Sequence, residues 1–151
     1  MRRIAPAIGL VVLLPLLLTG CGVQDLLQKR TSGTADSRDA LGHAWRTPAS
    51  QPDWVPADAK RIRYVAATDG SADATPASVR VTMRSALPEG CTTVPRHSLD
   101  AFGEDWAPST VPEVIERCGN WAVVRVDGGW FGWTPLSPRE RAEPAGPSEA
   151  G

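Results

Sequence analysis

Glycine and proline limit the fold of this chain more than any other feature of its sequence, because its 151 residues include 14 of each. Proline breaks the interior of a helix and glycine destabilises it, so a chain dense in both favours short elements joined by turns. This density argues against a helical bundle, while the length fits one domain. The 16 basic and 17 acidic residues nearly balance, which argues against a nucleic-acid partner held by bulk positive charge.

The N-terminus is arranged like an export signal. Two arginines stand at positions 2 and 3, and the run from Ile4 to Leu18 is apolar but shorter than the roughly 20 residues that a transmembrane helix needs. Next comes Leu18-Thr19-Gly20-Cys21, which resembles the lipobox of bacterial lipoproteins. The resemblance implies that residues 1–20 are a signal peptide, that cleavage occurs before Cys21, and that the Cys21 thiol takes a diacylglycerol.

A lipid anchor at Cys21 would place the mature chain on the extracytoplasmic face of the cell membrane, because two acyl chains hold a protein stably at a bilayer. No later apolar run in the sequence is long enough to span the bilayer as a helix. The alternative is an ordinary secreted protein in which the cysteine occurs by chance. Removal of residues 1–20 takes away two arginines and no acids, which changes the formal net charge from −1 to −3.

Cys91 and Cys118 remain as a pair once Cys21 is acylated. An even number of cysteines in an exported domain favours a disulfide, which would close a loop of about 28 residues and add roughly 3.5 kcal/mol in the chain-entropy model. A redox pair is the alternative, but such pairs usually have Cys-x-x-Cys spacing. The sequence therefore predicts a structural Cys91–Cys118 disulfide.

Composition divides the mature chain into three parts. Residues 21–43 are mostly small and polar, and they predict a flexible tether between the lipid and the domain. Residues 137–151 contain no large apolar side chain and predict a disordered tail. The globular domain is expected at residues 44–136, a size at which one disulfide contributes substantially to stability.

Two stretches of the chain alternate apolar and polar residues with the period of a β-strand. The first, from Arg61 to Ser85, predicts two strands joined by a loop, and the second predicts strands at 114–118, 121–127 and 130–134. Residues 87–112 contain four prolines and predict a loop with short extended pieces. The expected fold is mainly β, a small antiparallel hairpin or meander domain with one disulfide, and an α+β fold is the alternative.

The last predicted hairpin carries a candidate binding surface. A two-residue loop at Gly128-Gly129 would pair Val126 with Phe131, and this would give the hairpin one apolar face that belongs to the core. The other face would carry Trp121, Arg125 and Trp130, where indoles beside an arginine could bind a sugar ring or a peptide. The alternative is that these tryptophans only cover the second face of the hairpin. A one-residue slip in register would exchange the two faces.

The first predicted hairpin carries a second candidate surface, a basic one. Its polar face is expected to hold four arginines, namely Arg61, Arg63, Arg80 and Arg84. Guanidinium groups gathered on one face could bind an anionic envelope polymer or lipid headgroups. The alternative is a solvated face whose arginines pair with nearby carboxylates.

The sequence contains no motif for catalysis, metal binding or a cofactor: it has no nucleophile elbow, Ser-x-x-Lys, His-Glu-x-x-His or phosphate loop. His97 precedes Ser98, but neighbouring strand residues point to opposite faces, so His97 is poorly placed to activate the Ser98 hydroxyl. The leading hypothesis is a lipid-anchored, non-catalytic binding or interaction module of the cell envelope, with a glycan or protein partner. The alternatives are an enzyme that acts on envelope polymers and an accessory subunit of a membrane complex.

Overall fold

The computed structural model describes residues 29–145. The expected signal peptide, Cys21 and the last six residues lie outside this part of the chain. The described elements are β1 (Arg30–Ala35), α2 (Arg38–Ala44), β2 (Lys60–Ala67), β3 (Ala77–Thr82), β4 (Thr92–Pro95), β5 (Val114–Cys118), β6 (Trp121–Val126), β7 (Gly129–Thr134) and α3 (Pro138–Ala142).

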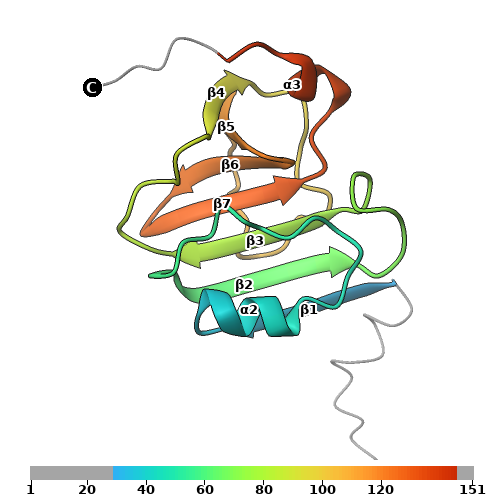
Figure 1. Ribbon diagram of the computed structural model, residues 1–151, viewed down its shortest axis with the longest axis vertical. Coiled ribbons are helices and arrows are strands. Elements are labelled where there is room, and N and C mark those ends of the chain that lie inside the picture. Colours follow the sequence, from blue (N-terminus) through green and yellow to red (C-terminus); the bar gives the residue numbers. More distant parts are fainter. Residues whose placement is uncertain (1–28, 146–151) are drawn as a thin grey trace, which may run out of the picture.

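The strands form one seven-stranded antiparallel sheet in the order β1-β2-β3-β7-β6-β5-β4 (Figure 1). Consecutive strands pair within β1–β3 and within β4–β7, and the pairing of β3 with β7 joins these two groups. The predicted mainly β, antiparallel fold with one disulfide is confirmed. Within residues 29–145, neither helix has the length and hydropathy of a membrane-spanning segment.

Alternation along the strands gives the sheet two faces, each with its own core. The first face carries Tyr64 and Val79, whereas the second face carries Phe131 and Trp133. In Figure 1 the segment from α2 to β2 passes in front of the sheet, and the segment from β4 to β5 passes behind it. Irregular segments therefore cover both faces of the sheet.

Three buried tryptophans pack the core of the first face. The ring of Trp45 lies 5.7 Å from that of Tyr64 and 6.2 Å from that of Trp121, measured between centroids. The ring of Trp54 also lies 6.2 Å from that of Trp121. A Cβ atom at Gly132 would stand 2.6 Å from the Trp54 indole, so a glycine is needed where this ring rests on β7.

The core of the second face lies under the segment between β4 and β5. The rings of Trp106 and Phe131 meet edge to face with centroids 6.0 Å apart, and Arg80 donates a 2.6 Å hydrogen bond to the Trp106 carbonyl oxygen. Trp133 packs on Phe131, and its indole N–H donates to Ser98 Oγ at 3.0 Å. Residues 96–112, which contain neither helix nor strand, are thus held against the sheet by these contacts and by the hydrogen bonds of Ser78 with Asp100 and of Arg30 with Glu104.

The flexible tether predicted at residues 21–43 is wrong for its second half. β1 pairs with β2 along its whole length, and α2 places Leu41, 2% exposed, in the core of the first face. The sequence between Thr31 and Thr34 is small and polar because β1 is an edge strand that buries little apolar surface. The folded domain therefore includes Arg30, and its predicted start at residue 44 is corrected.

The disordered tail predicted at residues 137–151 is also wrong for its first part. α3 begins with a capping box, in which Ser137 Oγ accepts from the Glu140 N–H and the Glu140 carboxylate accepts from the Ser137 N–H. Glu140 is fully buried. Its Oε1 atom accepts hydrogen bonds from the His97 N–H at 2.7 Å and from the N–H and the hydroxyl of Ser98, both at 2.9 Å.

Arg117 of β5 binds the other end of α3. Its guanidinium donates to the backbone carbonyl oxygens of Glu140 and Glu143, each at 2.7 Å. Polar contacts, and not apolar ones, therefore fix this segment to the domain. The segment was predicted to be disordered because it has no large apolar side chain, and its composition does not reveal polar contacts of this kind.

The Glu140 carboxyl group is held in its ionised form. Burial raises the pKa of Glu140, but hydrogen bonds from the backbone of His97 and Ser137, with side-chain contributions from Ser98 and Ser137, outweigh burial and lower this pKa from its ordinary value. A carboxyl group with a lowered pKa stabilises the fold above its unfolded-state pKa. That stabilisation is lost as the pH falls through the folded-state pKa.

Glu140→Ala is expected to lower the free energy of unfolding by about 3 kcal/mol at neutral pH, because buried donors on His97, Ser98 and Ser137 lose their acceptor. Urea denaturation measures this loss, and Arg139→Ala, on the exposed side of α3, is the matched control. The difference between wild type and Glu140→Ala should shrink as the pH falls through the lowered pKa of Glu140. Equal stability of Glu140→Ala and Arg139→Ala at neutral pH would contradict this role.

Candidate binding groove

The last hairpin turns one residue earlier than expected. β6 and β7 pair Val126 with Gly129 and Val124 with Phe131, so the loop is Asp127-Gly128 and the predicted pairing of Val126 with Phe131 is wrong. Gly128 has a φ of +76°, a left-handed conformation that glycine adopts without strain. The partner of each β6 residue shifts by two positions along β7, so the predicted faces of the hairpin are unchanged.

The predicted surface of Trp121, Arg125 and Trp130 is divided between the core and the exterior. Trp121 is 2% exposed and belongs to the core, so it does not share an open surface with Arg125 and Trp130 as predicted. Arg125 pairs with Trp130 across the two strands, and its guanidinium carbon lies 5.1 Å from the centroid of the Trp130 ring. Trp130 is half-buried and donates its indole N–H to the Ser85 carbonyl oxygen at 3.4 Å. Arg125 and Trp130 thus form a cation–π contact at the margin of the core.

The four arginines of the predicted basic face do not share one open surface. A register shift just before Arg63 places Arg61 at an irregular position with a φ of +49°. Arg80 lies opposite Arg63, but it is half-buried beneath the β4–β5 segment and binds the Trp106 carbonyl oxygen. Arg84 follows the end of β3. Arg63 and Arg80 therefore share one face, but the prediction of one open basic face fails at Arg80, which binds the covering segment.

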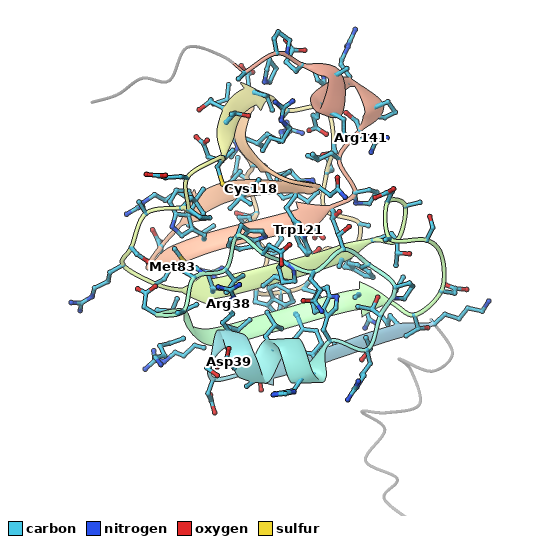
Figure 2. All side chains as sticks on the ribbon, in the orientation of Figure 1. Arg38, Asp39, Met83, Cys118, Trp121 and Arg141 are labelled. Carbon is cyan, nitrogen blue, oxygen red and sulfur yellow. A yellow bond between two sulfur atoms is a disulfide. The ribbon has the colours of Figure 1, made fainter. Side chains whose placement is uncertain are left out.

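A groove of about 600 Å³ lies on the first face of the sheet, where the disulfide joins the end of β5 to the loop before β4. Its lining comes from residues 50–54, 88–91 and 118–121, and Figure 2 labels Cys118 and Trp121 in this region. Trp54 and Trp121 belong to the lining, but each is only 2% exposed. Neither indole therefore offers an open ring face in the groove.

Hydrogen bonds hold one wall of the groove, at residues 50–54, against the turn between β5 and β6. Asn120 Nδ2 donates to Ser50 Oγ at 3.2 Å and to Asp73 Oδ1 at 3.1 Å. The indole N–H of Trp121 donates to the Gln51 carbonyl oxygen at 3.1 Å. This wall is thus fixed by contacts with the sheet and with the loop after β2.

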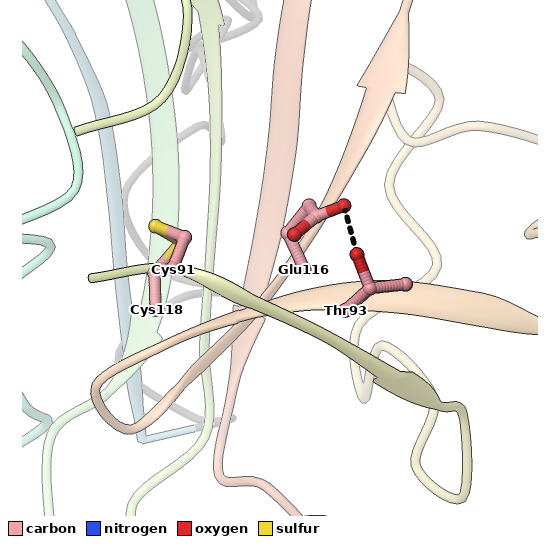
Figure 3. Close-up of a disulfide and its surroundings, with 4 residues drawn as sticks. All are labelled: Cys91, Thr93, Glu116 and Cys118. Carbon is pink, nitrogen blue, oxygen red and sulfur yellow. Dashed lines mark hydrogen bonds between the residues drawn. A yellow bond between two sulfur atoms is a disulfide. The ribbon is translucent and has the colours of Figure 1, made fainter. Parts of the chain in front are cut away.

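The Cys91–Cys118 disulfide holds the opposite wall, at residues 88–91 (Figure 3). The two Cα atoms lie 4.4 Å apart, and the predicted disulfide is confirmed. Cys118 ends β5 and is 7% exposed, whereas Cys91 stands just before β4 and is half-buried. Beyond the disulfide, Thr93 Oγ donates to Glu116 Oε1 at 3.0 Å, which supports the pairing of β4 with β5.

The charged side chains that line the groove are acidic. Asp53 and Glu89 belong to opposite walls and both are exposed, and Asp73 lies near the same end through its hydrogen bond to Asn120. Within the described residues, no lysine or arginine lines the groove. A neighbouring hollow of about 450 Å³ beside α2 shares Asp53 but includes Arg38, so its charge is mixed. The groove is therefore the better site for a cation, because a cleft lined by one sign of charge concentrates the opposite ion.

His97 and Ser98 both bind the Glu140 carboxylate. Their backbone N–H groups and the Ser98 hydroxyl all donate to Glu140 Oε1, as described above. In the part of the chain that the structure describes, no group of three or more His, Cys, Asp or Glu side chains is placed to hold a metal ion.

The acidic groove was not predicted, because its residues stand in loops without motif spacing. Glu89 lies between Pro88 and Gly90, which predict a turn and nothing about a ligand. The predicted Cys91–Cys118 pairing was the only signal that could have placed one wall of the groove beside the turn after β5.

Trp121→Ala is expected to lower the free energy of unfolding by about 3–5 kcal/mol, the usual range for loss of a core aromatic side chain. Trp130→Ala should lower the free energy of unfolding by about 1–2 kcal/mol, because folding buries less apolar area of this half-buried ring. Chemical denaturation of both variants against wild type measures the difference. Equal losses would mean that Trp130 belongs to the core as fully as Trp121 does.

Comparisons with known proteins give this chain no family. No family model matches it, and neither the curated proteins nor the solved structures searched contain a match. The chemistry of the groove is therefore read from the residues of this chain alone.

Proposed function

We propose that this chain is a lipid-anchored protein of the cell envelope, and that its domain binds a protein partner that places cationic side chains in the groove. The observation that carries the binding role is the groove itself, with Asp53 and Glu89 on its two walls and no basic side chain in its lining within the described residues. The volume of about 600 Å³ falls in the range of small-molecule and side-chain binding sites.

The disulfide supports export of the domain. Disulfides form and persist in oxidising compartments and are rare in the cytosol, so the Cys91–Cys118 bridge fits a position outside the cell membrane. The lipobox resemblance at residues 18–21 points to the same side of the membrane. Two independent features of the chain thus support one location.

A cationic protein segment fits the groove better than a glycan does. A sugar ring stacks on an exposed aromatic face, but Trp54 and Trp121 are buried to 2% exposure. A lysine or arginine side chain would instead form charge-assisted hydrogen bonds with the carboxylates of Asp53 and Glu89. The same contacts would serve an accessory subunit that holds a basic segment of a membrane complex.

Cys21→Ala is expected to move the protein from the membrane fraction to the soluble fraction, because one thioether-linked lipid is its attachment to the bilayer. The measurement is membrane fractionation combined with metabolic labelling by a fatty acid. The control is the double variant Cys91→Ala/Cys118→Ala, which keeps Cys21 and should stay labelled. Unchanged membrane association of Cys21→Ala would overturn the anchor.

The double variant Asp53→Asn/Glu89→Gln is expected to weaken binding of a trilysine peptide about tenfold, since two carboxylates that face the ligand lose their charge. Titration followed by tryptophan fluorescence or calorimetry measures the affinity. Binding to wild type should also weaken as salt is added, because the attraction is between solvent-accessible charges.

Asp105→Asn/Asp127→Asn is the matched control for this titration. It removes the same charge from exposed positions outside the groove lining and should leave trilysine binding unchanged. An equal loss of affinity in both double variants would show that only the net charge of the domain matters. Binding of a neutral oligosaccharide and not of trilysine would replace the cationic partner with a glycan.

A further inference from the structure

We propose that the Cys91–Cys118 disulfide is a redox-sensitive latch on one wall of the groove, so that reduction opens this wall while the sheet stays folded. The proposal rests on the proposed binding role of the groove for its biological effect. Its structural part stands on the contacts of the wall itself.

The segment 86–90, which carries most of this wall, has few attachments to the rest of the domain. Before it, Ser85 Oγ donates to the Asp58 carboxylate at 2.8 and 3.0 Å, and the Ser85 carbonyl oxygen accepts from Trp130. After it, Thr92 pairs with β5. Between these points, within the described structure, residues 86–90 make no hydrogen bond or ion pair, and only half-buried Leu87 packs against the core. The disulfide at Cys91 is therefore the main attachment of this wall.

The rest of the groove does not depend on the disulfide. The opposite wall is held by Asn120 and by the Trp121 indole, and both sets of hydrogen bonds lie outside the 86–91 segment. β4 keeps its ladder to β5 and the bond from Thr93 to Glu116 without the bridge. Breaking the sulfur–sulfur bond would thus release one wall and leave the other in place.

The position of the two sulfur atoms makes thiol exchange feasible. Both cysteines line the groove, and Cys91 is half-buried whereas Cys118 is 7% exposed, so a thiolate would attack Cys91 Sγ and displace the Cys118 thiolate. The co-reactant is a protein dithiol of the Cys-x-x-Cys class. Its second thiolate attacks the mixed disulfide and releases the Cys91 thiolate. Two electrons pass from the dithiol, which becomes a disulfide, to this chain, whose two thiolates take up the two protons.

Release of the wall would change what the groove can bind. Glu89 belongs to the released segment, whereas Asp53 belongs to the fixed wall. In the oxidised state the two carboxylates face one cleft, and in the reduced state the Glu89 carboxylate is free to move away. Reduction should therefore weaken the binding of a cationic ligand.

Limited proteolysis combined with far-ultraviolet circular dichroism tests the latch without any ligand. The detergent-purified full-length protein is compared in its oxidised form, after reduction by a phosphine, and as the variant Cys91→Ser/Cys118→Ser. We expect a glutamyl endopeptidase to cleave after Glu89 about tenfold faster in the two bridge-free forms, which keep the circular dichroism spectrum of the folded sheet. Loss of that spectrum in both bridge-free forms would overturn the proposal, since the bridge would then hold the whole domain together. An unchanged rate of cleavage after Glu89 would overturn it as well.

Trilysine titration of the same three forms tests the effect on binding. A severalfold loss of affinity in both bridge-free forms is the expected result, and equal affinity in all three forms would overturn a regulatory role for the latch. If the oxidised protein binds no trilysine at all, the proposed cationic partner fails, whereas the rate of cleavage after Glu89 still decides whether the wall opens. The two proposals are thus separated by different measurements.

Discussion

Both faces of an open antiparallel sheet must be covered, and the described residues 29–145 offer only two short helices, α2 and α3, with which to cover them. Irregular segments perform the task, residues 45–59 on one face and residues 96–112 on the other. Each segment needs large side chains to exclude water, because it has no regular array of apolar residues. Tryptophan removes the most apolar surface per residue, and these segments supply three of the six tryptophans, Trp45, Trp54 and Trp106, whereas the other three lie on β6 and β7. The groove lies on the first face, where the covering segment meets the turn between β5 and β6.

Irregular covering segments also need hydrogen-bond partners for their buried backbone N–H and C=O groups. A strand or a helix would supply these partners from its own backbone, but these segments contain neither. Buried or half-buried charged side chains meet this need. Glu140 accepts the N–H groups of His97 and Ser98, and Arg80 and Arg117 each donate to backbone carbonyl oxygens. These hydrogen bonds hold loops in place whose composition would predict that they are mobile. The domain therefore has an ordered surface despite its low content of regular structure.

The sequence was sufficient to predict the features that depend on local alternation and on the number of cysteines. The alternation around Tyr64 and Val79 gave the first hairpin, and the count of cysteines gave the Cys91–Cys118 bridge. It failed where tertiary contacts decide: β1 is polar because it is an edge strand, and α3 is held by the buried carboxylate of Glu140. The prediction that Trp121 is exposed was wrong for a related reason. The pattern of one hairpin cannot show that Trp45 and Trp54, which lie far away in the sequence, cover the face that carries Trp121.

The early start of β1 limits how far the domain can stand from a bilayer. Had the tether extended to residue 43, a chain anchored at Cys21 could have reached about 75 Å from the lipid, at the length of an extended residue. With Arg30 already in the sheet, nine residue steps remain, which span at most about 30 Å. For a protein anchored as we propose, the domain is thus confined to a layer close to the headgroups. Only partners that enter this layer, such as the juxtamembrane segments of other membrane proteins, are within its reach.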